Sequence, residues 1–411
     1  MTAPVLALVG TLDTKGEEYA YLRDRIREAG ASALLIDAGV LGRPGVTPDI
    51  TRQAVAEAAG RKIADLAAAG DRAAALGAMG EGARVILADL VESGSCSGVL
   101  AVGGSGGTSV AVRAFSRLPF GFPKMIVSTQ VASAGGALAG GSDVLLMSSV
   151  ADIAGLNRLT RRVLSNAAAA IVGAVGAPPV PGGARSLAFA TMLGLTTAGV
   201  TAAGARLQES GYEVVTFHAT GEGGRTMEEL IGPMGVRAML DLTTVEIADE
   251  VVGGTKSAGD DRLRTAGRLG VPQVVSTGGT DMVRFGPRDS VPEHFDNRLF
   301  HVHNDLVTLM RTSPEECLEI GRVIGTRLAE AVGPAVLMIP MRGSSAISVE
   351  GRPFHDPVAD EALVDGLRES LAGSDAEVVR MDAHINDPAF SQAAADRLLT
   401  ISERNDRAEQ Q

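Results

Sequence analysis

The chain has 411 residues and a net charge of −12; 45% of its residues are apolar, 51 are glycine and none is tryptophan. This length and composition predict two α/β domains whose cores are built from small aliphatic side chains. The acidic charge argues against a nucleic-acid partner, and the lack of a signal-peptide pattern or a long apolar run predicts a cytoplasmic chain without a membrane partner.

The N-terminal segment predicts a strand at residues 5–9, a polar turn and a helix from Tyr19, followed by a second strand at residues 34–36. In such units the ligand lies at the carboxyl ends of the strands. Lysine and threonine side chains there suit a phosphate, and an acidic residue suits a ribose hydroxyl. Alternatively, the turn caps its helix and the lysine is solvated. The candidates are Gly10, Thr11, Asp13, Thr14, Lys15 and Asp37.

A glycine-rich segment follows the apolar strand at residues 99–102 and precedes a helix predicted at residues 109–115. Backbone N–H groups in such a loop, and at the start of the helix, can hold an anion, and glycine lets it approach closely. The pattern is neither of the two best-known phosphate loops, so a purely structural glycine turn is the alternative. The candidates are Gly103, Gly104, Ser105, Gly106, Gly107 and Thr108, with Ser128 and Thr129 at the end of the next strand.

The remaining segments of the first half predict helices over residues 49–90 with a break near Gly70, a strand at 144–147 and a helix over 151–174. A proline- and glycine-rich stretch at residues 179–186 predicts a linker. The second half repeats the pattern, with strands at 187–192, 214–217, 271–277 and 335–339. We therefore expect two tandem Rossmann-like domains, each a mostly parallel sheet flanked by helices, at residues 1–178 and 187–402, with a polar, frayed tail at 403–411.

All six histidines lie after the predicted linker, so acid–base chemistry near neutral pH is expected in the second domain. Residues 218–225 form a second glycine-rich candidate anion loop. Arg342, beside Ser344 and Ser345, is either an anion clamp or a surface turn. His301 and His303 share one face of a strand and could ligate a metal, but the spacing fixes no third ligand, so whether a metal binds is left open.

Several longer motifs resemble the ATP-binding family named after the tomato mosaic virus resistance protein. They lie in the same order over nearly the whole chain, at residues 10–15, 103–108, 127–129, 149–157, 161–164, 217–225, 241–244, 281–283, 302–304, 308–312 and 384–388. The resemblance implies two Rossmann-like domains, ATP on the first, and a homodimer. It implies that Thr11, Asp13, Thr14, Lys15 and residues 103–108 contact the nucleotide. It implies no reaction, and residues 276–280 depart from the family pattern.

These observations favour an enzyme that binds ATP on the first domain and acts on a small anionic metabolite. Phosphoryl or nucleotidyl transfer would require Mg²⁺. The acid–base and anion-binding candidates of the second domain are His218, His303, Arg311, Arg342 and His384. One alternative is a non-catalytic, nucleotide-gated factor that binds or inhibits another protein. Another is a lyase or hydrolase in the second domain with a structural nucleotide.

Overall fold

A computed structural model describes residues 3–178, 183 and 185–409. The chain divides into two compact units, Met1–Val180 and Pro181–Gln411. Most of the predicted linker, residues 179–182 and 184, lies outside the described residues.

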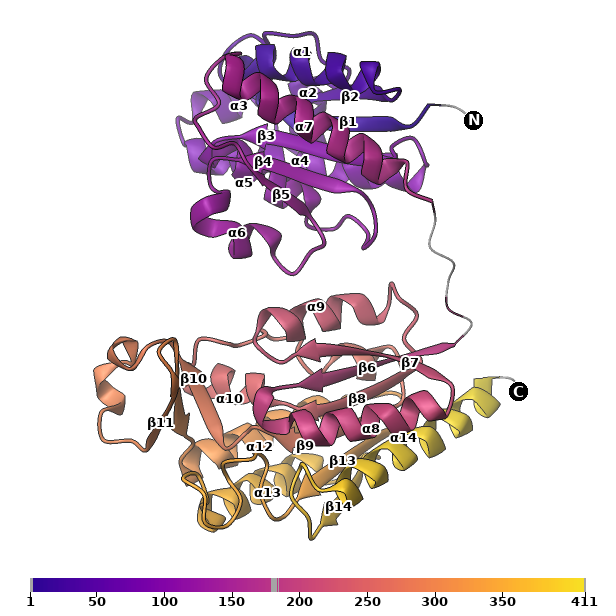
Figure 1. The fold of residues 1–411 in the computed structure, drawn as a ribbon, viewed down its shortest axis with the longest axis vertical. Helices are drawn as coiled ribbons and strands as arrows, with labels where there is room; N and C mark the ends of the chain where they lie inside the picture. Colours follow the sequence, from indigo (N-terminus) through magenta and orange to yellow (C-terminus); the bar gives the residue numbers. More distant parts are fainter. Residues whose placement is uncertain (1–2, 179–182, 184, 410–411) are drawn as a thin grey trace. The chain divides into compact units, whose positions relative to one another are not determined.

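The first unit is a five-stranded parallel sheet in the order β2-β1-β3-β4-β5. Its strands alternate with helices along the chain (Figure 1). The elements are β1 (Val5–Gly10), α1 (Leu12–Glu28), β2 (Ser32–Asp37), α2 (Arg52–Ala58), α3 (Ile63–Ala68), α4 (Arg72–Glu92), β3 (Gly98–Gly103), α5 (Ser105–Phe115), β4 (Lys124–Ser128), α6 (Val131–Ala139), β5 (Leu145–Ser148) and α7 (Arg158–Val175).

Both faces of this sheet are buried, which explains why its central strands are continuous apolar runs rather than alternating ones. On β1, Leu6 and Leu8 pack against α1 and α7, whereas Ala7 and Val9 face α2, α4 and α5. The small Ala7 side chain lets a helix approach the sheet closely. The core therefore consists of two thin aliphatic layers, as the composition predicted.

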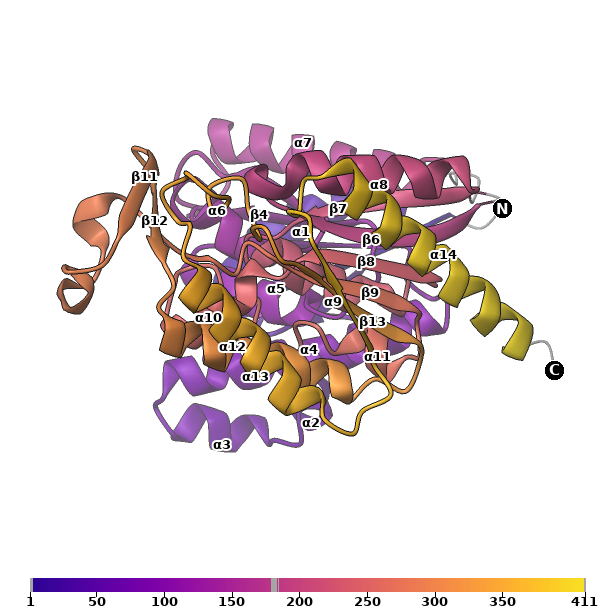
Figure 2. The ribbon, with the colours of Figure 1, turned by 90° about the horizontal axis from the view of Figure 1, so that it is seen from below.

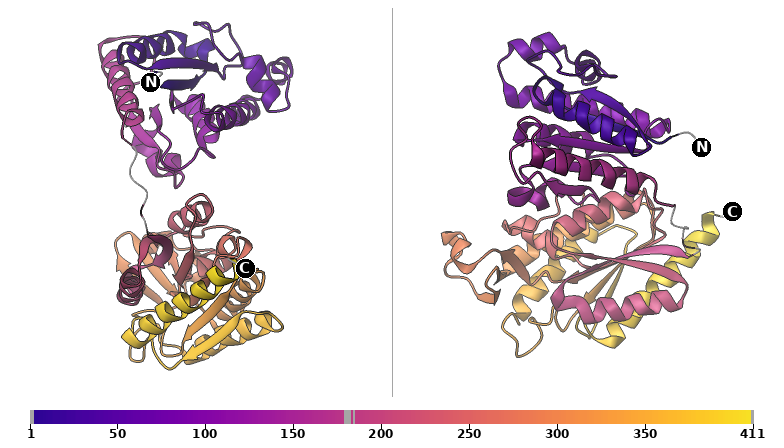
Figure 3. Two further views of the ribbon diagram at one scale, coloured as in Figure 1. Left: turned by 90° about the vertical axis from the view of Figure 1, so that its right-hand side faces the viewer. Right: turned by 45° about the horizontal axis from the view of Figure 1, so that its top comes forward.

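The second unit has a six-stranded parallel sheet in the order β14-β13-β9-β8-β6-β7. Helices α8 and α14 pack side by side on one face, and α9 to α13 lie on the other (Figure 3). The elements are β6 (Ser186–Met192), η1 (Gly194–Thr196), α8 (Thr197–Glu209), β7 (Tyr212–His218), α9 (Glu222–Ile231), β8 (Ala238–Thr243), α10 (Val245–Val252), α11 (Thr265–Arg268), β9 (Gln273–Gly278), α12 (Pro314–Ala329), β13 (Ala335–Pro340), α13 (Pro357–Leu371), β14 (Glu377–Met381) and α14 (Pro388–Glu409).

Between β9 and α12 the chain inserts a three-stranded antiparallel sheet in the order β10-β12-β11. Figure 2 shows β11 and β12 projecting from the main body of this unit. The insertion comprises β10 (Met282–Phe285), η2 (Arg288–Ser290), η3 (Glu293–Phe295), β11 (Phe300–Asn304) and β12 (Val307–Arg311). The predicted architecture, two α/β units with parallel sheets flanked by helices, is confirmed, whereas this insertion was not foreseen.

Three predicted boundaries were wrong. Residues 105–108 form the first turn of α5, not a loop before the helix. Residues 151–157 are not helical, because Asn157 caps α7 and its side chain accepts the N–H groups of Leu159 and Thr160. Residues 403–409, expected to form a frayed tail, continue α14, where Ile401 and Ser402 are buried.

Candidate functional site

A cavity of about 240 Å³ lies at the carboxyl ends of β1 and β3 in the first unit. These strands are neighbours in the sheet but are separated along the chain by β2, so the strand order reverses between them. In open α/β sheets the ligand crevice lies at such a switch point. The cavity is lined by Thr11, Asp13, Thr14, Val40, Leu41, Leu66, Ala67, Gly70, Asp71, Arg72, Ala75, Leu76, Gly106 and Gly107.

One wall of the cavity is the first turn of α5. The first amides of α5 lack intrahelical acceptors, as in every helix, and its N-cap Gly104 has no side chain to accept them. The Arg72 guanidinium, from the exposed start of α4, comes close to this turn. A Cβ placed on Gly106 would lie 3.2 Å from Arg72 Nη2. The turn therefore combines free N–H groups, a positive helix end and a cation, all of which favour an anion.

The predicted glycines have different roles. Gly106 and Gly107 line the cavity. A Cβ on Gly103 would lie 2.8 Å from Gly107 Cα, so Gly103 lets β3 and α5 approach each other. A Cβ on Gly10 would overlap the ring of buried Tyr19, so that glycine makes room for α1 rather than for a ligand. Ser105 is exposed and lies outside the cavity lining.

Asp13 fixes the segment that follows β2. Its Oδ2 accepts the N–H groups of Val40, Leu41 and Gly42 at 3.1, 3.0 and 3.3 Å. The side chain is only 5% exposed, and Arg52 Nη1 lies 4.0 Å from Oδ2. Asp13 lines the cavity, but its hydrogen bonds hold the segment after β2 in place.

Asp37, proposed as a ribose contact, lies outside the cavity lining and is fully buried. Its carboxylate accepts Arg52 Nε at 2.8 Å and the N–H groups of Leu12 and Gly39. All these donors are internal, and Asp37 therefore joins β2 to α1 and α2. The expectation of a ribose contact does not fit this arrangement.

The hydroxyl candidates separate into two groups. Thr11 and Thr14 line the cavity, with their Oγ1 atoms 2.9 Å apart. The Oγ1 atom of Thr108 and the Oγ atom of Ser128 lie 2.6 Å apart in the interior, joining α5 to β4. Thr129 lines a separate hollow at the ends of β4 and β5. Thr11 and Thr14 are thus the hydroxyl candidates that the fold brings to the cavity.

Lys15 points away from the cavity. Its Nζ donates to the carbonyl of Ile153 in the segment between β5 and α7, and Lys15 is absent from the cavity lining. Arg72, which does stand beside the α5 turn, was not singled out from the sequence. The signal for Arg72 was its place directly after Asp71, which caps α4 with a 3.0 Å bond to the N–H of Ala74.

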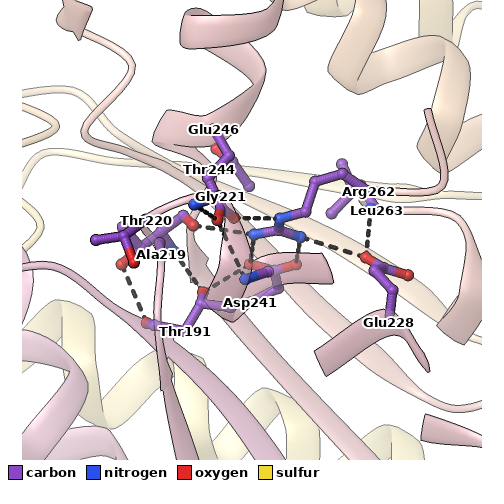
Figure 4. Close-up of polar contacts among 12 residues, drawn as sticks. Thr191, Ala219, Thr220, Gly221, Glu228, Asp241, Thr244, Glu246, Arg262 and Leu263 are labelled. Atoms are coloured by element: carbon purple, nitrogen blue, oxygen red, sulfur yellow. Dashed lines mark hydrogen bonds and ion pairs between the residues drawn. The ribbon is translucent and has the colours of Figure 1, made fainter. Parts of the chain in front are cut away.

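The second glycine-rich segment holds an anion from its own chain (Figure 4). Glu246 Oε1 accepts the N–H groups of Gly221 and Gly224 at 2.6 and 3.2 Å, at the start of α9. Gly224 leaves room for this carboxylate, which a Cβ there would overlap. Arg225 instead forms an exposed ion pair with Glu222. The predicted anion-binding geometry is present, but Glu246 fills it.

Glu246 belongs to a buried network centred on Arg262, which is 0% exposed. Arg262 Nε donates to Glu246 at 2.7 Å, and its Nη2 donates to Asp241 at 2.8 Å (Figure 4). Glu228 lies 3.5 Å from Arg262 and accepts the N–H of Leu263, which has a φ of +70°. Burial raises the pKa of Glu228, whereas the nearby Arg262 lowers it. This network fills the space beside the carboxyl end of β8 in the second sheet.

The fold does not gather the five predicted catalytic residues into one site. His218 and His303 are exposed at the ends of different sheets. Arg342 is exposed and 3.5 Å from Asp382. His384 Nε2 lies 3.0 Å from Asp387. Arg311 is buried and forms an ion pair with Asp360 at 2.6 Å.

Arg311 lies beside buried Asp281, which appeared in the sequence analysis only within the motif at residues 281–283. Asp281 accepts the hydroxyls of Ser344 and Ser345 at 2.9 and 2.7 Å. Burial raises the pKa of Asp281, partly offset by Arg311. The cavity beside Ser344 and Asp360 has about 20 Å³, room for one water molecule.

Two family models together match almost the whole chain. The N-terminal domain of the Uncharacterised protein family (UPF0261) matches residues 4–179, and its C-terminal domain matches residues 185–402. The chain belongs to the UPF0261 family.

UPF0261 relatives resemble the chain over most of their length. A UPF0261 protein of Clostridium tetani is 43% identical over 97% of this chain and 99% of the relative, and one of Rhizobium meliloti is 42% identical over 94% and 96%. The tomato protein "ToMV resistance protein Tm-1(GCR237)" is 37% identical over 81% of this chain and 45% of its own length. The predicted family membership is therefore confirmed. A putative UDP-N-acetylglucosamine 2-epimerase from Listeria monocytogenes aligns over 97% of this chain and 95% of its own, at 12% identity and a TM-score of 0.23.

The part of this UPF0261 chain that the structure describes contains no group of three His, Cys, Asp or Glu side chains able to hold a metal ion. His301 and His303 on β11 thus have no third ligand among the described residues. No helix among those residues has the length and apolarity to cross a bilayer.

Proposed function

We propose that the first unit binds ATP at the cavity between β1 and β3. The phosphates lie against the first turn of α5 and the Arg72 guanidinium, and the nucleoside lies against the aliphatic part of the wall. The observation that carries the proposal is the cavity itself, where free helix amides, a cation and an apolar surface meet. Few ligands other than a nucleotide need all three.

The electrostatics of the cavity support a phosphate despite the chain's net charge of −12. Helix amides and a nearby guanidinium act over a few ångströms, whereas the field of the net charge is screened over about 8 Å at physiological salt. In the described part of the second unit, the amides at the start of α9 are not free for a phosphate, because Gly221 and Gly224 donate to Glu246. We therefore assign one nucleotide to each chain.

Mg²⁺ would accompany the phosphates rather than bind first. No group of three described His, Cys, Asp or Glu residues could hold a metal ion, and Mg²⁺ is usually bound through one or two carboxylates, waters and phosphate oxygens. Asp71 is the exposed carboxylate of the cavity wall. Asp13 is less suited, because its Oδ2 accepts three backbone N–H groups.

Calorimetry on the full chain tests the nucleotide proposal. We expect ATP with Mg²⁺ to bind more tightly than AMP, because the α5 turn and Arg72 contact the outer phosphates. Gly106→Val would fill the space beside Arg72 and Leu76 and weaken ATP binding more than tenfold. Gly173→Val on α7, where a Cβ meets nothing within 4 Å, is the control and should bind normally. Wild-type protein that fails to bind millimolar ATP overturns the proposal.

We further propose an enzyme that acts on a small anionic metabolite, as a homodimer. Arg311 at the end of β12, Asp281 just before β10 and Asp360 in the first turn of α13 are the groups that support it. ATP turnover that depends on a metabolite extract would support this reading. Tight ATP binding without turnover would instead favour a nucleotide-gated binding factor. Light scattering in solution tests the dimer.

A further inference from the structure

Leu41 lies at the edge of the cavity in an unusual state for a large apolar residue. It is 82% exposed although it lines the cavity. A single exposed leucine is ordinary on a protein surface. What distinguishes Leu41 is that its backbone N–H is hydrogen-bonded in place although its side chain is exposed to solvent.

The Asp13 carboxylate holds this backbone segment in place. Its Oδ2 accepts the consecutive N–H groups of Val40, Leu41 and Gly42, so one side chain of α1 sets the path of the segment after β2. Gly39 makes the arrangement possible, because a Cβ there would lie 2.6 Å from Asp13 Oδ1. Hydrogen bonds to the buried Asp13 carboxylate thus fix the backbone of Leu41, while its side chain stays exposed.

The other apolar part of the wall comes from α3 and α4. Leu66 and Ala75 are buried and Leu76 is half-buried, and all three line the same cavity as Leu41. The α5 turn and Arg72 supply the polar part of the wall, and Leu76 borders it, because a Cβ on Gly106 would lie 3.2 Å from both Arg72 Nη2 and Leu76 Cδ1. The cavity therefore has a polar part suited to phosphate and an aliphatic part suited to a flat, weakly polar ring.

We propose that Leu41 and the α3–α4 wall hold the nucleobase of the bound nucleotide, and that Asp13 is a positioning residue that holds Leu41 against it. This assignment rests on the proposed nucleotide binding and adds the orientation of the ligand. Leu41 contacts the base and not the phosphates. Asp13 contacts neither and acts through the three amides of residues 40–42.

The test compares ATP with inorganic tripolyphosphate, which has the phosphates but no base, by calorimetry on the full chain. Leu41→Ser should weaken ATP binding about tenfold, because apolar contact with the ring is lost, and leave tripolyphosphate unchanged. Leu306→Ser is the matched control, since Leu306 is 74% exposed in the second unit. It should change neither affinity.

Asp13→Ala should also weaken the binding of ATP and leave the binding of tripolyphosphate unchanged. The double variant Asp13→Ala/Leu41→Ser should bind ATP as tightly as whichever single variant has the lower affinity. Such non-additivity identifies residues that act as one unit, which a general loss of stability would not produce. The inference is overturned if Leu41→Ser weakens both ligands equally or neither, or if the two substitutions add. Failure of wild type to bind ATP would instead overturn the proposed function.

Discussion

Two basic side chains, Lys15 and Arg72, show that residue type and motif do not establish which side chain lies beside the cavity. Lys15 belongs to a motif that marks the family resemblance, yet its ammonium donates to the Ile153 carbonyl. Arg72 belongs to no recognised motif, yet it stands beside Gly106 at the positive end of α5. A phosphate on the α5 turn would meet Arg72 first.

We therefore predict that Arg72→Ala weakens ATP binding more than Lys15→Ala does. Loss of a hydrogen bond to a charged group costs about 1.5–3 kcal/mol, or roughly ten- to a hundredfold in affinity, and this is expected for Arg72. Lys15→Ala should change the affinity less than about threefold, the ammonium being engaged elsewhere. Calorimetry with both variants decides it. The reverse order would show that Lys15 leaves Ile153 when the nucleotide binds.

Asp360 gives a pH prediction at the same scale. Burial raises its pKa from the ordinary 3.8 to about 6, against the effect of Arg311 and with that of Asp281. The folded chain then holds a proton that the unfolded chain has released, so this contribution to stability is present below about pH 4 and lost as the pH rises through 6.

Urea unfolding from pH 4 to pH 7 measures this contribution. Wild type should lose stability relative to Asp360→Asn as the pH rises across that range. Asp365→Asn, on the exposed side of the same helix, controls for the removal of a charge. If Asp360→Asn and Asp365→Asn change the pH dependence of stability equally, the effect belongs to a group other than Asp360.

At the scale of elements, the start of α9 shows how an anion-binding geometry can serve the fold alone. Glu246 on α10 supplies the carboxylate, and Arg262 compensates its charge. Glu246→Ala would leave two amides and part of a buried guanidinium unpaired. We expect a loss of about 3 kcal/mol in the free energy of unfolding. Urea denaturation followed by circular dichroism measures it.

Glu222→Ala is the matched control for this prediction. Glu222 lies in the first turn of α9, whose amides Glu246 accepts, and it pairs with Arg225 in solvent. Its replacement by alanine should lower the free energy of unfolding by less than about 1 kcal/mol. Similar losses for both variants would mean that the buried network contributes little.

The elements themselves were predictable because their signals are local. Apolar runs followed by polar or glycine residues predicted the parallel strands, and apolar residues three or four positions apart predicted the helix faces. The three-stranded insertion was missed because its strands are short and its pairing is set by distant residues. The site was predicted in part: the α5 turn and Thr11 lie within a few residues of their strands. Arg72 was missed because it lies more than 30 residues before Gly106 in the sequence, and only the packing of α4 against α5 brings the two together.

At the scale of the molecule, the two units repeat one strand order, but the carboxyl ends of their strands are open in one unit and filled in the other. In the first unit the switch point is open and lined by aliphatic residues, Arg72 and helix amides. In the second, Arg262, Asp241 and Glu246 fill the edge. The first unit therefore has an open cavity at this position, where we propose the nucleotide, and the second unit has a closed counterpart, a difference that no strand pattern reveals.

This division makes the first unit separable. Each buried apolar cluster among the described residues draws its members from one unit, and every residue that lines the cavity between β1 and β3 comes from the first. A fragment of residues 3–178 should therefore fold, as judged by circular dichroism, and bind ATP within about threefold of the full chain, because a domain of this size can bury its own core. The fragment with Gly106→Val is its control and should fold without binding. A folded wild-type fragment that does not bind ATP would mean that residues after 180 complete the site.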